Sequence, residues 1–372
     1  MKMKVLEVIR QGEIGGGESH VIDLVRCLRS HEDVEPVVLA FTDGPMITLL
    51  RGEGFKCHVI PTGRAFDVKA MMAVRRLIKS EGISLVHAHG SRAVTNIMLV
   101  CRRLGIPYIY TVHGWSFHEG QSSLIFKLRQ LSERWLCSSA RRVICVSTSN
   151  FATGRNAFGL DAGSTTVIEN GINLKRFNAD GTYPDVRSEL SLGTDDFVVA
   201  FICRITAQKG PMDYVRAIEQ ASQSCPQLRG LMVGEGDMAA EVDAYIDTHG
   251  LADVIIRQPF RSDVPALLAA ADVFCLPSLW EGLSIAMLEA MAMRRPIVVT
   301  MTDGARDVIV DGQNALVVPP QHPAELAKAF LKYSNDRDLC CRMGAAAHAL
   351  VQQRFDAQRV ADRVHEIYQS CV

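Results

Sequence analysis

The sequence predicts an α/β protein built from two Rossmann-like, doubly wound parallel-sheet domains. Short apolar runs typical of buried strands alternate with helical segments along nearly all of the 372 residues, which is the pattern of a parallel sheet. A chain of this length is ordinarily divided between about two domains. Residues 178–193 are polar, contain Gly181, Pro184 and Gly193, and show no regular period, so we expect an interdomain linker there.

Composition points to a cytoplasmic globular protein. With 48% hydrophobic and 22% charged residues, the chain has ordinary globular composition, and it lacks the run of about 18 apolar residues that a membrane span requires. We expect the first residues to lead directly into a strand and do not expect a cleavable signal. None of the eleven cysteines forms a C-x-x-C pair. Cys145, Cys203 and Cys275 lie in apolar runs, so we expect buried free thiols and a reducing compartment.

Charge is unevenly distributed between the two halves. Residues 1–180 hold 23 basic and 16 acidic side chains, whereas the remainder holds 17 basic and 25 acidic ones. The segment Leu124–Ala140 combines Lys127, Arg129 and Arg134 with apolar and aromatic residues. A basic amphipathic helix of this kind suits the surface of an anionic bilayer, although an ordinary solvated helix remains the alternative.

A glycine-rich segment follows the first predicted strand, Val5–Ile9. Residues 11–18 contain Gly15, Gly16 and Gly17, and a helix is expected from His20 to Leu28. Glycines after a strand let backbone N–H groups approach a phosphate. The segment is a poor dinucleotide fingerprint, because His20 stands where the third glycine should be, so nicotinamide binding is disfavoured.

Histidines follow two further strands of the first half. The predicted strands Leu85–His89 and Tyr108–Val112 bring His87, His89 and His113 to their carboxyl ends, where parallel sheets bind ligands. We expect His87 and His89 to alternate between faces and therefore not to share a metal ion, with only His89 facing a cleft. For His113 alone, a polar cap of the strand is the competing interpretation.

Two cations follow the first strand of the second half. Arg204 and Lys209 lie five residues apart after Val198–Ile202, and Gly210 and a helix come next. This arrangement suits a diphosphate, and two solvated loop cations are the alternative. Pro211 is expected to delay the helix until Asp213.

Two glutamates flank a helix that is apolar on every face. The strand Val273–Leu276 and a short turn precede a predicted helix from Ile285 to Met293, whose N-terminus would suit a phosphate. Glu281 stands before the helix and Glu289 eight residues later, where we expect burial and a polar partner. Alternatively, Glu281 caps the helix and Glu289 is a satisfied core acid.

This E-x(7)-E pattern, followed by Glu-Ala-Met-Ala, resembles the retaining glycosyltransferases of family four, which have the GT-B fold. The segments Val86–His89, Thr111–Gly114, Arg204–Gly210 and Leu231–Gly236 resemble further family elements in the same order. The resemblance implies two Rossmann-like domains facing across a cleft. Residues 1–177, with the C-terminal helix 356–372, would form the acceptor-side domain, and residues 178–355 the nucleotide-sugar-binding domain.

The resemblance also implies a reaction. The chain would be a retaining, metal-independent hexosyltransferase that moves a sugar from a UDP- or GDP-linked donor to an acceptor, with no cofactor. The acceptor would be a glycan or lipid-linked molecule in bacterial polysaccharide, lipopolysaccharide or glycolipid assembly, at the inner face of the membrane, and nucleic acid is not an expected partner. A GT-B nucleotide-sugar epimerase and a non-catalytic nucleotide-sugar-binding protein are the alternatives.

The resemblance assigns site residues in both domains. His113 and Glu281 would contact the donor sugar, and Arg204 and Lys209 would neutralise the diphosphate. Glu289 would hold the ribose hydroxyls. The other implied donor-binding residues are Gly16, Gly17, Gly234, Phe260, Arg261, Gly282, Leu283, Ser284 and Ile285. Ser284 stands where the family often has glycine, which leaves the donor sugar open. No metal ligand is implied, and the Asp336–Asp338 pair is interpreted as surface charge.

Overall fold

The computed structural model describes residues 2–118 and 120–372 and divides into two compact units. The first unit is Met1–Gly171 together with Ala357–Val372, and the second is Ile172–Asp356. The sequence placed the corresponding boundaries after residues 177 and 355. The terminal segment belongs to the first unit in both descriptions.

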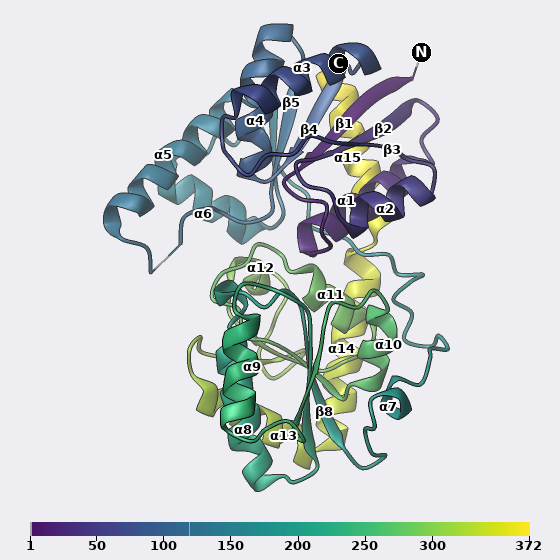
Figure 1. Ribbon diagram of the computed structural model, residues 1–372, viewed down its shortest axis with the longest axis vertical. Helices are drawn as coiled ribbons and strands as arrows, with labels where there is room; N and C mark the ends of the chain where they lie inside the picture. The colour runs from purple at the N-terminus through teal and green to yellow at the C-terminus, as the bar shows by residue number, and fades with distance from the viewer. Residues whose placement is uncertain (1, 119) are drawn as a thin grey trace. The chain divides into compact units, whose positions relative to one another are not determined.

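The first unit contains a seven-stranded sheet in the order β3-β2-β1-β4-β5-β6-β7, and every neighbouring pair is parallel (Figure 1). The order reverses between β1 and β4, and ligands of open α/β sheets bind outside the carboxyl ends of strands at such a point. The strands are β1 (Met3–Ile9), β2 (Val34–Ala40), β3 (Lys56–Val59), β4 (Leu85–His89), β5 (Tyr108–Val112), β6 (Arg142–Cys145) and β7 (Thr165–Val167).

Helices cover both faces of this sheet. One core cluster joins the strands to apolar residues of α3, α4 and α5, and another joins them to α1 and the terminal helix α15. Val364 and Tyr368 of α15 are almost fully buried there. The helices are α1 (Gly16–Leu28), α2 (Pro45–Gly52), α3 (Val68–Glu81), α4 (Ser91–Leu104), α5 (Ser123–Ser139), α6 (Thr148–Phe158) and α15 (Ala357–Cys371).

The second unit contains a six-stranded parallel sheet in the order β10-β9-β8-β11-β12-β13. Its order reverses between β8 and β11, so these two strands define the ligand-binding edge of this unit. The strands are β8 (Phe197–Ile202), β9 (Leu228–Val233), β10 (Ile255–Gln258), β11 (Val273–Leu276), β12 (Ile297–Thr300) and β13 (Leu316–Val318).

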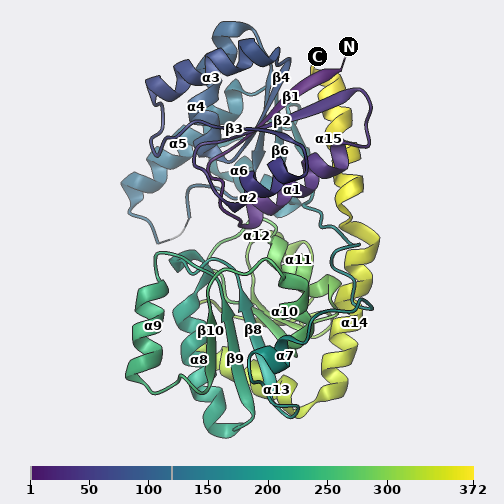
Figure 2. The ribbon, with the colours of Figure 1, turned by 45° about the vertical axis from the view of Figure 1, so that its right-hand side comes forward.

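The helices of the second unit also lie on both sides of its sheet (Figure 2). Apolar residues of α8, α9, α13 and the start of α14 form one core cluster with the strands, and α10, α11 and the rest of α14 lie on the other side. The helices are α7 (Val186–Glu189), the 3-10 turn η1 (Ala207–Lys209), α8 (Pro211–Ser224), α9 (Ala239–Thr248), α10 (Val264–Ala270), α11 (Ile285–Ala292), α12 (Asp303–Arg306), α13 (Pro323–Asn335) and α14 (Arg337–Arg354).

The two parallel sheets confirm the predicted fold class, but the predicted first residues of two helices were wrong. Helix α1 begins at Gly16 rather than His20, so Gly16 and Gly17 form its first turn instead of a loop. Helix α8 begins at Pro211 rather than Asp213. Proline is well tolerated at the first helical position, because the N–H it lacks would have no partner within the helix.

Three smaller expectations can be compared with the structure. Cys145 and Cys275 are buried free thiols as predicted, whereas Cys203 is only partly buried. Asp336 caps α14, since its side chain accepts a hydrogen bond from the backbone N–H of Leu339. No helix in the described part of the chain is long and apolar enough to cross a membrane.

Candidate functional site

In the second unit, the loops after β8 and β11 are joined by an ion pair between Lys209 and Glu281. The side chains of these residues are only 12% and 11% exposed. The Ser278 hydroxyl donates a hydrogen bond of 3.0 Å to the same carboxylate oxygen of Glu281. Because a charge removed from water needs a partner, each of these two groups depends on the other in the ligand-free protein.

Two hydrogen bonds to backbone carbonyls hold the same two loops together. The Gln208 side-chain amide donates to the carbonyl of Trp280 at 2.8 Å, and the Leu279 N–H donates to the carbonyl of Gln208 at 2.8 Å. Lys209 and Glu281 were assigned separately to phosphate and sugar from the sequence. Their mutual pairing was not predicted, because 72 residues separate them and only the fold brings them together.

Two glycines let neighbouring loops approach at this edge of the sheet. Gly234 has φ +141°, and a Cβ there would lie 2.1 Å from the carbonyl oxygen of Cys203. Gly210 has φ +65°, and its Cβ would lie 2.4 Å from the carbonyl oxygen of Pro277. Side chains rarely adopt such backbone angles and no neighbour can yield here, so both positions require glycine. For Gly234, the structure thus gives a packing reason for a residue that the sequence assigned to donor binding.

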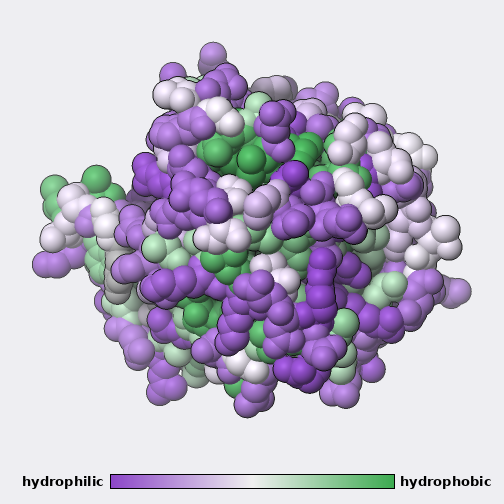
Figure 3. Space-filling view, turned by 90° about the horizontal axis from the view of Figure 1, so that it is seen from below, coloured by the Kyte–Doolittle hydropathy of each residue, from purple (hydrophilic) through white to green (hydrophobic). Residues whose placement is uncertain are grey.

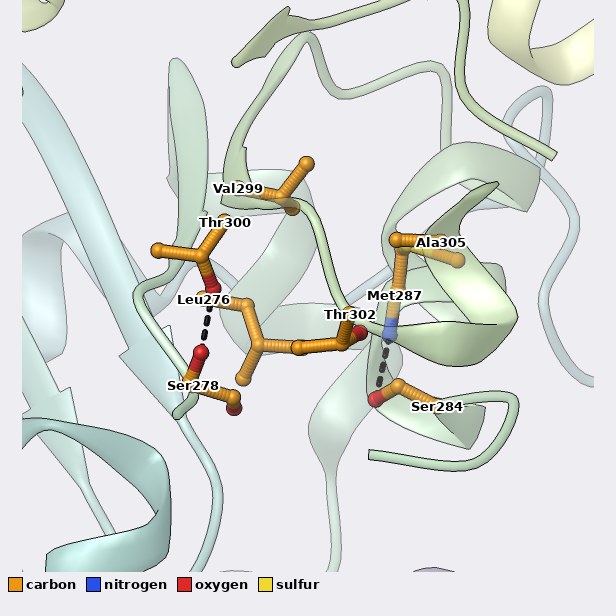
Figure 4. A pocket seen from close by; sticks show the side chains of 8 residues that line it. All are labelled: Leu276, Ser278, Ser284, Met287, Val299, Thr300, Thr302 and Ala305. Atoms are coloured by element: carbon orange, nitrogen blue, oxygen red, sulfur yellow. Dashed lines mark hydrogen bonds between the residues drawn. The ribbon is translucent and has the colours of Figure 1, made fainter. Parts of the chain in front are cut away.

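The N-terminus of α11 lies at the ends of β11 and β12. Ser284 is the N-cap, and its hydroxyl oxygen accepts a hydrogen bond of 3.4 Å from the Met287 N–H (Figure 4). It lines a small pocket together with Ser278 and Thr300, whose hydroxyl donates to the Ser278 carbonyl. Ser284 therefore supports the helix start while its hydroxyl proton stays available to donate.

The predicted residues next to Ser284 offer backbone groups rather than side chains. Leu283 and Ile285 are 3% and 5% exposed, so their side chains belong to the core. Gly282 accepts a hydrogen bond of 2.9 Å from the Gly304 N–H, and a Cβ on Gly304 would lie 2.0 Å from the Gly282 carbonyl oxygen. This close approach fixes the turn that leads into α11.

The remaining predicted residues of the second unit differ in how strongly they are held. Arg204 is exposed, and its guanidinium makes no hydrogen bond or ion pair within the described residues. Arg261 forms ion pairs with Asp263 and Glu189, and these hydrogen bonds raise the pKa of its guanidinium. Its positive charge is therefore already paired within the protein. Phe260 is 40% exposed. Of the two arginines, Arg204 is more available to an anionic ligand.

Glu289 is not the buried acid that the sequence predicted. It is partly exposed, because it lies on the edge of α11 that the rest of the unit does not cover completely. The expectation of deep burial assumed that an apolar sequence on all sides means burial on all sides. A partly exposed carboxylate is able to contact a ligand directly.

In the first unit, His113 lies beside the first turn of α1. A Cβ on Gly17 would lie 3.8 Å from Cδ2 of His113, so Gly17 is adjacent to this histidine. Nε2 of His113 lies 3.2 Å from Nδ1 of His89, and the ring of His20 lies 4.9 Å from that of His113, centroid to centroid. The structure thus gathers histidines from α1, β4 and the end of β5.

These three histidines are neutral near pH 7. Burial lowers the pKa of His20 to about 3 and that of His89 to about 4, with nearby histidine charges adding to the effect. Burial also holds the pKa of His113 well below its usual value. Neutral imidazole rings have one N–H donor and one acceptor nitrogen, so the direction of each hydrogen bond matters.

The expectation that His87 and His89 alternate between faces was wrong. Residues two apart on a strand share a face, and the two rings lie 4.2 Å apart, centroid to centroid. Both contact the same carboxylate oxygen of Glu7, at 3.3 Å for His87 and 2.9 Å for His89. Opposite faces are therefore not a reason why His87 and His89 could not share a metal ion.

Two overlapping sets in this region have ligand atoms close enough to hold a metal ion. They are His20, His89 and His113, and Glu7, His87 and His89, with the candidate atoms of each set within 4.8 Å of one another. Both ring nitrogens of His89 already have hydrogen-bond partners, however. That the reaction needs no metal ion stays a prediction.

Sequence reasoning missed Glu7, Ser278 and Tyr368. An acid within the apolar run Val5–Ile9 was a usable signal, because a charged residue in a buried strand must find partners. The Tyr368 hydroxyl donates to Glu7 at 2.6 Å from a helix 361 residues away, and no local pattern indicates that contact.

Comparison with known proteins gives matches along most of the chain. Residues 14–176 match the family described as Glycosyltransferase Family 4, and residues 183–349 match Glycosyl transferases group 1. The chain is 24% identical to UDP-Gal:alpha-D-GlcNAc-diphosphoundecaprenol alpha-1,3-galactosyltransferase of Escherichia coli, over 81% of this chain and 79% of that protein. It is 26% identical to Alpha-maltose-1-phosphate synthase of Mycolicibacterium smegmatis, over 95% of each.

Solved structures show the same fold. Anabaena Alr3699/HepE in complex with UDP and glucose matches with a TM-score of 0.85 at 24% identity, over 99% of this chain and all of that one. WaaG, a glycosyltransferase involved in lipopolysaccharide biosynthesis, matches with a TM-score of 0.78 at 15% identity, over 98% and 99% of the two chains.

Proposed function

Because this chain belongs to the family-four glycosyltransferases, which have the GT-B fold, we propose that it transfers a sugar from a nucleotide-diphosphate sugar with retention of the anomeric configuration. The acceptor is a glycan or lipid-linked molecule of bacterial cell-surface assembly. The observation that carries the proposal is the ion pair of Lys209 with Glu281 at the ligand-binding edge of the second sheet. That UDP and UDP-glucose are bound in solved structures of Alr3699/HepE supports a nucleotide-sugar donor.

The chain's cations would stabilise the leaving group of the reaction. The diphosphate departs as an oxocarbenium-like sugar forms, and negative charge builds on the departing phosphate. Lys209, Arg204 and the first N–H groups of α11 would stabilise that charge, so the reaction would need no metal ion. The N–H groups of Gly16 and Gly17 at the start of α1 are further candidate donors to the nucleotide sugar.

The two glutamates would have different tasks. An arriving diphosphate competes with Glu281 for Lys209, and the released Glu281 carboxylate becomes an acceptor for sugar hydroxyls. The partly exposed Glu289 carboxylate would hold the ribose hydroxyls. In a retaining reaction of this kind the acceptor attacks from the side of the leaving group, and we assign no general base.

A panel of UDP- and GDP-sugars tests the proposed reaction. One donor should give an acceptor-dependent product whose anomeric configuration, read by NMR, matches that of the donor, with the rate unchanged by EDTA. An inverted product or a loss of activity on chelation would contradict the proposal. Formation of an epimer from the donor alone would indicate an epimerase instead.

Substitutions at the second unit test where the nucleotide binds. Lys209→Ala and Glu289→Ala should each weaken UDP binding by about 2–3 kcal/mol, the cost of losing a hydrogen bond to a charged group. Isothermal calorimetry measures the affinity. Lys328→Ala and Glu325→Ala are matched controls, because these residues pair with each other on the exposed surface of α13. Unchanged UDP affinity in both site variants would show that the nucleotide binds elsewhere.

We also propose that α5 contacts an anionic membrane surface. Its residues Leu124, Leu128, Leu131 and Trp135 recur at helical spacing and are 70%, 57%, 61% and 46% exposed. Lys127, Arg129 and Arg134 of the same helix are exposed as well. In Figure 3, hydrophobic side chains project at the left edge of the molecule, the side on which Figure 1 draws α5. An apolar stripe with neighbouring cations fits the interface of an anionic bilayer.

Liposome flotation tests this membrane contact. The protein should float with vesicles containing phosphatidylglycerol at low salt, and binding should fall with neutral vesicles or at high salt, because surface charges are then screened. A Leu124→Gln, Leu128→Gln, Leu131→Gln triple variant should lose flotation. Val310→Gln, which alters an exposed apolar residue in the second unit, should retain it. Flotation that ignores lipid charge and salt would contradict the proposal.

A further inference from the structure

The carboxylate of Glu7 organises the buried polar groups of the first unit. Glu7 lies on β1 with no exposed surface, and its register partner on β4 is His87. One carboxylate oxygen is 2.9 Å from Nε2 of His89, and the other accepts a hydrogen bond of 2.6 Å from the Tyr368 hydroxyl. Burial alone would raise the pKa of Glu7, but the charge of His87 and the hydrogen bonds of His87 and His89 outweigh it and hold the pKa well below its usual value.

An ionised Glu7 determines which nitrogen of His89 carries the proton. A carboxylate only accepts hydrogen bonds, so Nε2 of His89 must be the protonated nitrogen. Since burial keeps this ring neutral near pH 7, its Nδ1 has a lone pair and acts as an acceptor.

The same reasoning extends to the next ring. Nδ1 of His89 is 3.2 Å from Nε2 of His113, so that nitrogen must donate. His113 is also neutral, so its Nδ1 is left with a lone pair. Among the residues that the structure describes, no hydrogen bond is made to this Nδ1.

We propose that Glu7 is a positioning residue that acts through His89 to hold His113 in the tautomer with an unprotonated Nδ1. That nitrogen is suited to accept a hydrogen bond from a hydroxyl group of the donor sugar. This role rests on the proposed glycosyl transfer and on the contact of His113 with the donor sugar that the family resemblance implies. The tautomer itself follows from the hydrogen-bond chain together with an ionised Glu7 and neutral rings of His89 and His113, and it needs no donor sugar.

Three further elements keep Glu7 in place. The hydroxyl of Tyr368 on α15 lies 2.6 Å from Nδ1 of His87 as well as 2.6 Å from Glu7. Nε2 of His87 lies 2.7 Å from the Thr111 hydroxyl on β5. Turning Glu7 away would leave several buried polar groups without partners, which is costly. The C-terminal helix therefore contributes to the orientation of a histidine at the carboxyl end of β5.

Nitrogen-15 NMR of the histidine rings tests the chain of hydrogen bonds directly. In the wild-type protein, His113 should show a protonated Nε2 and an unprotonated Nδ1. Glu7→Gln keeps the shape of the side chain but removes its charge, so His89 and His113 should become mixtures of tautomers. The variant's kcat should fall by about 10- to 100-fold, as is typical when a group that orients a functional histidine is lost.

Other readouts separate positioning from general damage. UDP affinity of Glu7→Gln should change less than twofold, because the side chains proposed to bind the diphosphate and ribose, Lys209, Arg204 and Glu289, lie in the second unit. Glu7→Asp retains the carboxylate and should recover the wild-type tautomer at least in part. Asp33→Asn is the matched control, because Asp33 also bonds a histidine of α15, His365 at 2.9 Å, without joining this chain. It should leave the His113 signals unchanged.

Two results would overturn the inference. One is a wild-type His113 protonated on Nδ1, and the other is a Glu7→Gln protein in which the His113 tautomer is unchanged. The wild-type spectrum decides the first point even if Glu7→Gln fails to fold. Because the NMR readout needs no donor, absence of glycosyl transfer would remove the proposed function while leaving the tautomer test valid. Transfer by an enzyme with the opposite tautomer would remove this inference alone.

Discussion

The ion pair between Lys209 and Glu281 is the interaction on which the ligand-binding edge of the second unit depends. Both groups are almost removed from water, so neither charge is stable there without the other or a substitute. The glycines at 210 and 234 allow the loops to meet closely enough for the pair to form. A diphosphate is a substitute for the carboxylate. In the ligand-free protein, Glu281 thus keeps Lys209 in place. A bound diphosphate would replace Glu281 as the partner of Lys209 and free the Glu281 carboxylate.

A second buried carboxylate has a comparable place in the first unit. Glu7 lies on β1, one of the two strands between which the strand order of the first sheet reverses. Lys209 and Glu281 follow β8 and β11, the two strands between which the order of the second sheet reverses. Each acid is held by groups distant in sequence, Tyr368 in one case and Lys209 in the other. In one unit the acid balances a cation, and in the other it sets the direction of a series of hydrogen bonds. Parallel sheets gather such groups because their strand ends meet at one edge.

The sequence predicted the fold class and most positions of the candidate site, because alternating strands and helices and the spacing of Arg204, Lys209, Glu281 and Glu289 are local patterns. It did not predict which of these groups pair, since pairing depends on long-range packing. It misplaced the start of α1 because glycines were taken as loop residues. The prediction that His87 and His89 point to opposite faces was an error of reasoning. In a strand, residues two apart share a face, so the sequence already implied that the two rings lie together.

A crystal structure of the protein with UDP tests the central claim most directly. The diphosphate should lie within hydrogen-bonding distance of Lys209 and Arg204, and the Lys209–Glu281 contact should be broken, with Glu281 free to accept from a sugar. UDP bound away from the ends of β8 and β11, or bound there with the ion pair intact, would contradict this account.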